Sequence, residues 1–145
     1  MPKLKLVIDT NIWIRAILTA GTGRHVVEYA LAWTSVFYSQ QMLDELYEKL
    51  DTRKLRLKVD PEVKKKLLGR IVKHAIKVDI DKIIAVCDDP DDDVFFACAK
   101  SVSADFLISA DPHILNIPKY ITTQTMHPKR FKELFLDVAT PPGHH

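Results

Sequence analysis

The chain has 145 residues and a formal net charge of +2, with 47% hydrophobic and 28% charged residues. This length and composition are ordinary for one globular domain with a single core, and leave little room for a second domain. Cys87 and Cys98 lie in apolar surroundings without CxxC or Cys/His neighbours, which argues against a zinc site or a disulfide scaffold and predicts reduced core thiols. No apolar run is long enough to span a bilayer and no signal peptide is evident, so we expect a cytoplasmic protein without membrane contact.

Strand and helix patterns alternate along the chain, which is typical of βα units around a parallel sheet. The expected elements are a strand over 4–8, helices over 12–18 and 25–33, a strand over 35–38, helices over 40–50, 61–74 and from 92 or 93 to 100, strands over 106–108 and, more weakly at the sheet edge, 120–123, and a helix over 128–135. Ser39 and Asp60 are good helix caps, and Pro61 suits the first turn. We therefore predict a single α/β domain over 1–138, followed by a disordered or tag-like tail over 139–145.

Four acidic residues are distinguished by their positions in these predicted elements. Asp9 and Asp111 each follow a strand, Glu45 lies inside the helix after the second strand, and Asp93 begins a helix after the acidic run 88–93. Strand ends and helix starts of a doubly wound sheet meet at one edge, where such folds bind their ligands. Carboxylates gathered there repel one another unless a divalent cation is bound, and an oxygen-only set suits Mg²⁺ or Mn²⁺.

Each of these residues also has a plain structural interpretation. Asp9 and Asp111 could simply cap turns, and Asp93 could simply be a helix N-cap. Glu45 could be a solvent-facing partner of Lys49 at i,i+4. The run 88–93 could be a solvated acidic loop. Four such coincidences in this order are less expected than any one alone, so the joint pattern favours a shared metal site. Because three aspartates are adjacent, Asp91 or Asp92 could take the place of Asp93.

The chain resembles the PIN domain family, and in particular its single-domain prokaryotic branch of VapC-like toxin components of toxin–antitoxin pairs. The resemblance rests on blocks in family order over nearly the whole chain: Val7–Trp13, Ser39–Leu46, Asp89–Ala99, Ser103–Asp111 and Pro128–Phe131. It implies a PIN-like three-layer α/β/α sandwich with a mainly parallel central sheet. Ala110 replaces the glycine usual before the last aspartate, and His127 stands where serine or threonine is common. Both are small departures from the family pattern.

The resemblance further implies a metal-dependent endoribonuclease, a hydrolase in which four residues are both catalytic and metal-binding: Asp9, Glu45, Asp93 and Asp111. Thr10, Asn11 and Ser109 would be supporting polar residues. The implied cofactor is Mg²⁺ or Mn²⁺, as one or two ions, and the implied partners are an RNA substrate and a cognate antitoxin protein.

A bound Mg²⁺ ion can orient a water, lower its pKa and stabilise charge on a scissile phosphate. Basic residues must then hold the rest of the RNA strand, and the candidates in loops near the site are Arg15, Arg24, Arg53, Lys54 and Arg56. An ordinary solvated surface is an equally good interpretation of each. We also expect a homodimer, with Trp13, Ile17, Tyr29 and Trp33 exposed around the early helices as interface anchors, although burial in the core is the alternative.

Two other functions are compatible with parts of the pattern. A haloacid-dehalogenase-like phosphatase also begins with a strand that ends in Asp, but it needs a second Asp two positions on, where this chain has Asn11. An asparagine cannot act as general acid, so this interpretation is disfavoured. A non-catalytic PIN-like module that binds RNA or a partner protein is the other alternative, and specific uptake of divalent ions would distinguish the enzyme from it.

Overall fold

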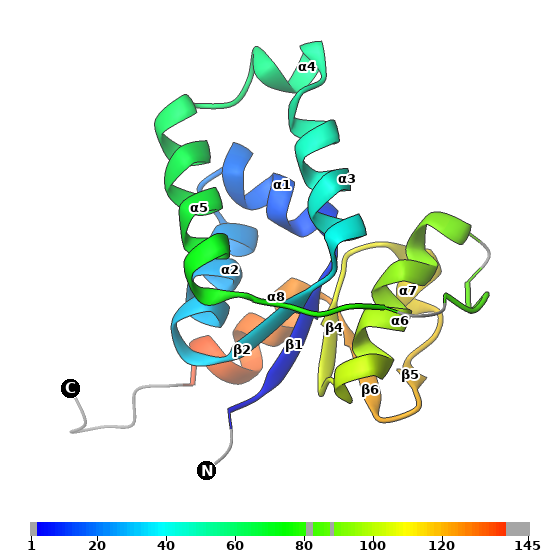
Figure 1. The fold of residues 1–145 in the computed structure, drawn as a ribbon. Helices are drawn as coiled ribbons and strands as arrows, with labels where there is room; N and C mark the ends of the chain where they lie inside the picture. Colours follow the sequence, from blue (N-terminus) through cyan, green and yellow to red (C-terminus); the bar gives the residue numbers. More distant parts are fainter. Residues whose placement is uncertain (1–2, 81–82, 88, 139–145) are drawn as a thin grey trace.

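The computed structural model describes residues 3–80, 83–87 and 89–138, and it contains a six-stranded sheet in the order β3-β2-β1-β4-β6-β5. The strands are β1 (Lys5–Ile8), β2 (Ser35–Tyr38), β3 (Ile76–Lys77), β4 (Phe106–Ile108), β5 (Lys119–Tyr120) and β6 (Thr123–Met126). All neighbouring pairs are parallel except β5 and β6. The carboxyl ends of β1 and β4 therefore lie side by side at one edge of the sheet (Figure 1).

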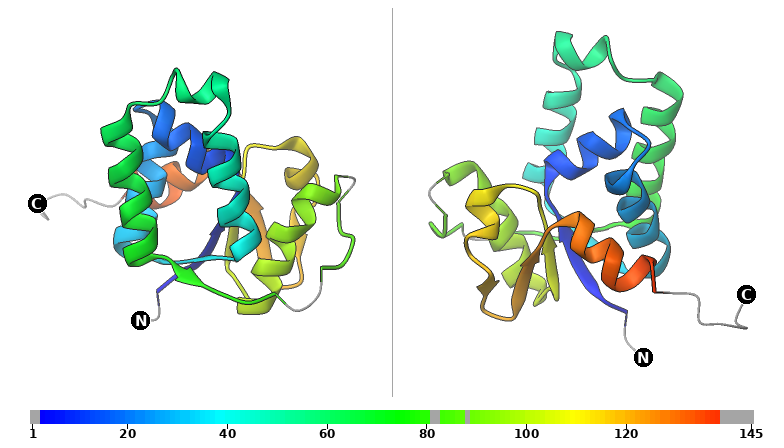
Figure 2. Two further views of the ribbon diagram at one scale, coloured as in Figure 1. Left: turned by 45° about the horizontal axis from the view of Figure 1, so that its top comes forward. Right: turned by 180° about the vertical axis from the view of Figure 1, so that it is seen from behind.

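Helices cover both faces of this sheet, which gives the three-layer α/β/α arrangement (Figures 1 and 2). The helices, with two short irregular turns, are α1 (Thr10–Leu18), α2 (Thr22–Trp33), α3 (Gln40–Leu50), α4 (Arg53–Arg56), α5 (Pro61–His74), η1 (Pro90–Asp92), α6 (Asp93–Val102), α7 (Pro112–Leu115), α8 (Pro128–Phe131) and η2 (Lys132–Leu136). The predicted fold class, a mainly parallel α/β sandwich of PIN type, is confirmed.

Two apolar clusters fill the space between the layers. Leu6 and Ile8 of β1 join a cluster with α1, α2, α5 and α8, whereas Val7 joins a second cluster with α6. This alternation follows from the pleat of a strand, whose successive side chains point to opposite faces. All three side chains are fully buried. A short strand that is apolar on both faces thus fixes β1 at the centre of the sheet, and Asp9 directly follows it.

Most predicted elements have the predicted bounds. Strands β2 and β4 and helices α3 and α5 agree with the predicted ranges, and the predicted caps are present: Ser39 accepts a hydrogen bond from the Met42 amide, and Asp60 accepts one from the Glu62 amide. The final helix begins at Pro128 as expected and continues as the wider turn η2 to Leu136. These elements carry strong local signals, namely caps and regular apolar spacing.

The predicted edge strand over 120–123 is wrong in its limits. Residues 121 and 122 form the turn between β5 and β6, where Ile121 adopts a φ of 57°, and β6 rather than an edge strand pairs with β4. The short elements α4, β3 and α7 were not predicted, because two to four residues are too few for a periodic pattern. The predicted tail over 139–145 lies outside the described residues.

The expected exposure of the early aromatic residues is largely wrong. Trp13 is 5% exposed and donates its indole N–H to the Ile8 carbonyl at 3.1 Å, and Ile17 is 2% exposed. Tyr29 packs edge-on against Phe131, and only Trp33, at the end of α2, is exposed, at 68%. The core is larger than the sequence suggested because α1 is covered by α2, α3 and α5 together.

Helices α3, α4 and α5 form an arm that rises from the sheet, with α4 at its tip, and this arm is called the α3–α5 arm below (Figure 1). Within the described ranges, no helix is both long enough and apolar enough to cross a membrane. Cys87 and Cys98 are free thiols, and Cys98 is buried. Burial raises the pKa of the Cys98 thiol to about 12, so this residue is an inert part of the core.

Candidate active site

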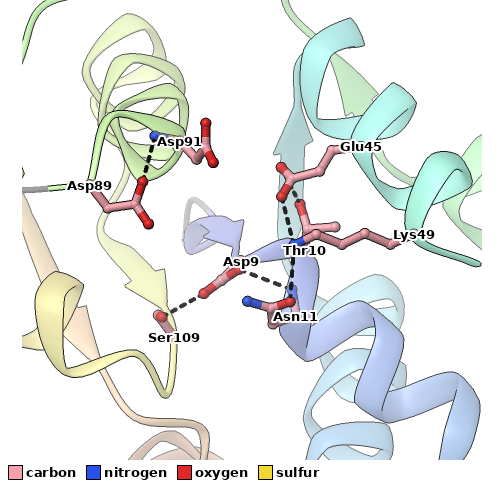
Figure 3. Close-up of polar contacts among 8 residues, drawn as sticks. All are labelled: Asp9, Thr10, Asn11, Glu45, Lys49, Asp89, Asp91 and Ser109. Atoms are coloured by element: carbon pink, nitrogen blue, oxygen red, sulfur yellow. Dashed lines mark hydrogen bonds and ion pairs between the residues drawn. The ribbon is translucent and has the colours of Figure 1, made fainter.

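Asp9 is at the centre of the polar cluster at the carboxyl edge of the sheet. It caps α1: its Oδ1 accepts a hydrogen bond from the Asn11 amide at 2.9 Å, and its Oδ2 accepts one from the Ser109 hydroxyl at 2.7 Å (Figure 3). Burial raises the pKa of Asp9, although these two hydrogen bonds and the charge of Lys49 oppose the shift. Burying a carboxylate to 1% exposure is costly, and the hydrogen bonds from Asn11 and Ser109 compensate part of that cost.

Glu45 projects from α3 toward the start of α1. The Thr10 hydroxyl lies 3.4 Å from Glu45 Oε2, and the Lys49 ammonium lies 2.8 Å from Oε1 and 3.2 Å from the Asn11 side-chain oxygen (Figure 3). The ion pair between Glu45 and Lys49, considered above as the plain interpretation of Glu45, is therefore present, and it lies next to Asn11 within the polar cluster. Lys49 ties Glu45 to Asn11 in the first turn of α1, close to Asp9, so α3 and the end of β1 contribute to one polar cluster.

Asp111 follows β4 and caps the short helix α7, accepting a hydrogen bond from the His113 amide at 2.9 Å. The Asp111 amide donates a hydrogen bond to the Ser109 hydroxyl oxygen at 3.0 Å, and that hydroxyl in turn donates to Asp9. The negative charge of Asp111 also contributes to the raised pKa of Asp9. Ser109 therefore connects the ends of the two central strands, and the predicted supporting residues Thr10, Asn11 and Ser109 all contact the acidic cluster.

The acidic run before α6 presents Asp92, and not Asp93, to Asp9 and Asp111. Burial, followed by the negative charge of Asp111 and then that of Asp9, raises the pKa of Asp92 to about 7. Its Oδ2 is buried and accepts no hydrogen bond from any described residue. Asp93 Oδ1 instead accepts hydrogen bonds from the amides of Val86 and Cys87, at 2.9 and 2.8 Å.

The different orientations of Asp92 and Asp93 come from the local backbone. Asp89 accepts a hydrogen bond from the Asp91 amide and starts the turn η1, so that Asp92 and Asp93 leave the first turn of α6 in different directions (Figure 3 shows Asp89 and Asp91). One side chain is directed to the strand ends and the other to the segment 86–87. The sequence left Asp91, Asp92 and Asp93 as alternatives because all three fit a helix start. The loop that satisfies Asp93 is visible only in the folded chain.

The donor set fits a hard divalent cation. Every candidate ligand is a carboxylate oxygen, and the buried, unpartnered Oδ2 of Asp92 has the raised pKa expected of a carboxylate that lacks a counter-charge. Among the residues described, no three His, Cys, Asp or Glu side chains are already arranged closely enough to hold an ion. Glu45 is paired with Lys49, so Glu45 would have to leave this ion pair to join a shared ligand set.

Comparison with known proteins assigns the class. The family model described as PIN domain matches residues 5–113, a range that contains all the acidic residues above, and the chain therefore belongs to the PIN domain family. PIN domains are generally nucleases that use divalent metal ions. No match is found among curated proteins.

The fold also resembles a solved structure. A chain of VapBC2 from Rickettsia felis, crystallised bound to a DNA fragment from their promoter, superposes with a TM-score of 0.57 at 14% sequence identity. The match covers 86% of this chain and 98% of that one. At this identity the similarity concerns the fold alone.

Proposed function

We propose that this protein is a metal-dependent endoribonuclease whose metal-binding residues are Asp9, Glu45, Asp111 and Asp92, the last in place of Asp93. The observation that carries the proposal is the buried Asp92 carboxylate, which lies within the field of Asp111 and Asp9 and has no counter-charge. When bound, Mg²⁺ or Mn²⁺ would neutralise this cluster and activate a water for hydrolysis. Thr10, Asn11 and Ser109 would fix the carboxylates by the hydrogen bonds described above.

The distribution of charge supports a polyanionic substrate. Residues 53–77 contain ten Lys or Arg and two Asp or Glu, a net charge of +8 in a chain whose total is +2, so the remainder carries −6. These residues comprise α4 at the tip of the α3–α5 arm, α5, and the edge strand β3 that follows it (Figure 1). Lys65, Lys66 and Lys73 line a surface hollow of about 670 Å³ on α5, and none of them forms an ion pair with a described residue. Such segregation attracts a phosphate backbone while the metal offsets the acidic site.

Cleavage of a mixed RNA pool with added Mn²⁺ tests the proposal. Wild-type protein should cut the RNA, EDTA should abolish cutting, and Asp9→Asn should be inactive although folded. Asp105→Asn is the matched control, because Asp105 is an exposed aspartate at the start of β4, at the opposite edge of the sheet. Equal cutting by wild type and Asp9→Asn would mean that a contaminant is responsible and that the assignment of this site fails.

The cluster residues can be assigned by the same assay. Asp92→Asn should abolish cutting, whereas Asp93→Asn should retain activity in proportion to its folded fraction. The opposite result would assign Asp93, and not Asp92, as a metal-binding residue. If the wild-type protein neither binds divalent ions by calorimetry nor cuts RNA, the protein is a binding module instead of an enzyme.

We also propose a cognate antitoxin and a homodimer as partners. The first rests on family membership and on the fold shared with a chain of VapBC2, and co-purification with the product of a neighbouring small gene would test it. The second rests on Trp33, a large exposed side chain at the end of α2. Light scattering should give twice the mass of 16.6 kDa, and Trp33→Ser should shift it to the monomer. A monomeric wild type at all concentrations would refute the homodimer.

A further inference from the structure

A cavity of about 510 Å³ adjoins the acidic cluster on the side of α1. Asp9 and Asp111 lie in its wall together with Asn11, Arg15, Leu18 and Thr19. The right-hand view of Figure 2 shows that α1 and the segment from β4 to α7 rise from the same edge of the sheet. The cavity therefore continues directly from the carboxylates along one helix.

Three further polar side chains of this cavity are spaced along a single face of α1 and its C-terminal cap. Asn11, Arg15 and Thr19 are four residues apart, so that Arg15 lies roughly 6 Å further from Asp9 along the helix axis than Asn11 does. Ile14 and Leu18 add apolar surface between them. The carboxylates lie at one end of the cavity, a cation lies further along, and apolar side chains lie between them. This arrangement complements one nucleotide, with its phosphate at the cation and its base or sugar on the apolar side chains.

Arg15 is the cation in this wall, and no described residue neutralises its charge. It is exposed and forms no ion pair or side-chain hydrogen bond with any described residue, and its stem lies over Gly23, where an added Cβ would stand 3.5 Å from Arg15 Cγ. Arg24, by contrast, donates to the Ala16 and Ile17 carbonyls at 2.7 and 3.2 Å and so caps the end of α1. The two arginines therefore differ: Arg24 stabilises the end of α1, whereas the Arg15 guanidinium is free to bind a ligand.

We propose that this cavity binds the nucleotide next to the scissile phosphate of a single-stranded RNA, with the Arg15 guanidinium on the flanking phosphate. The inference rests on the proposed function and adds where the strand lies. A guanidinium forms paired hydrogen bonds with phosphate, and the apolar surface of Ile14 and Leu18 suits an unpaired base or sugar. Arg15 is a substrate-binding residue on this assignment.

Binding of a fluorescein-labelled single-stranded 12-nucleotide RNA, measured by anisotropy with Mg²⁺, tests the inference without activity. An Asp9→Asn background prevents cutting, and Arg15→Ala, Arg15→Lys and Arg130→Ala are added to it. Arg130 is an exposed arginine on α8, so its loss changes the net charge equally. Urea unfolding of each variant gives the folded fraction used to normalise the affinities.

Arg15→Ala should weaken RNA binding about 10-fold, as expected for a lost charged hydrogen bond. It should also reduce the slope of log Kd against log salt by about 0.7, the value for one phosphate contact on a single strand. Arg15→Lys should keep the slope and lose only part of the affinity, and Arg130→Ala should stay within about twofold of the background. Equal effects of Arg15→Ala and Arg130→Ala, or a background that binds no RNA, would overturn the inference.

Cleavage kinetics separate this inference from the proposed function. In the otherwise wild-type protein, Arg15→Ala should raise KM with a smaller change in kcat, because it removes ground-state binding. If the wild type cuts RNA and Arg15→Ala cuts with an unchanged KM, the inference fails and the proposed function stands. If the wild type does not cut but binds RNA in an Arg15-dependent way, the proposed function fails and the binding assignment stands.

Discussion

Asp92→Asn and Asp93→Asn should change the stability of the metal-free protein in opposite directions. The two residues are adjacent, both are buried, and the substitutions are identical in size and charge, so each serves as the control for the other. Asp92 repels Asp111 and Asp9, whereas Asp93 accepts two backbone hydrogen bonds. The sign of each effect follows from these different partners.

The magnitudes follow from the same contacts. The rise in the Asp92 pKa from 3.8 to about 7 corresponds to a penalty of at most ~4 kcal/mol for the ionised form, at about 1.36 kcal/mol per tenfold change in the protonation constant. Because the half-buried Asp111 carboxylate can turn to water, Asp92→Asn should gain about 1–3 kcal/mol in free energy of unfolding. Asp93→Asn should lose about 1–2 kcal/mol, since its hydrogen bonds to Val86 and Cys87 lose their charge.

The pH dependence identifies the cause of the Asp92 effect. Below pH 3.8 the Asp92 carboxyl is protonated in both the folded and the unfolded chain and imposes no penalty. Between pH 3.8 and about 7 it ionises in the unfolded chain first, so the penalty grows with pH and is complete above about 7. The advantage of Asp92→Asn over wild type should therefore increase from pH 4 to 7 and then level off.

Urea unfolding in EDTA, followed by circular dichroism at several pH values, measures both effects. A destabilised Asp92→Asn, or an advantage that does not vary between pH 4 and 7, would refute the repulsion argument. A neutral Asp93→Asn would show that the two hydrogen bonds to the segment 86–87 are not formed in solution.

Three further outcomes are expected. Mg²⁺ or Mn²⁺ at 100 times its dissociation constant should add about 2.7 kcal/mol to the free energy of unfolding, and Asp9→Asn should lose this gain; a gain that survives in Asp9→Asn would place the ion elsewhere. Phe131→Ala should cost about 3–5 kcal/mol in urea unfolding, because Phe131 is 0% exposed and packs against three aromatic rings, and a cost below 1 kcal/mol would contradict that packing. Replacing Lys65, Lys66 and Lys73 with Gln should weaken RNA binding at low salt and flatten its salt dependence, whereas an unchanged salt slope would remove α5 from the RNA-binding surface.

The sequence by itself determined the elements with strong local signals. The apolar strand that ends at Asp9, the Ser39 and Asp60 caps and the regular apolar spacing of α3 and α5 predicted their elements within a residue or two. The order of these elements also predicted a parallel sheet, and hence that Asp9 and Asp111 lie at the same edge. These features depend on short-range geometry, which neighbouring residues fix.

Only the tertiary structure decided which side chains meet. Asp92 and Asp93 look equivalent in the sequence, but a loop 6 or 7 residues earlier in the chain satisfies Asp93 and leaves Asp92 facing the strand ends. Trp13 was expected at the surface and is buried, because α2, α3 and α5 together cover α1. Arg15 and Arg24 likewise differ in role through contacts that no local pattern encodes: Arg24 caps a helix, and Arg15 lines the cavity beside the carboxylates. Contacts made only in the folded chain therefore distinguish residues that local propensity leaves equal.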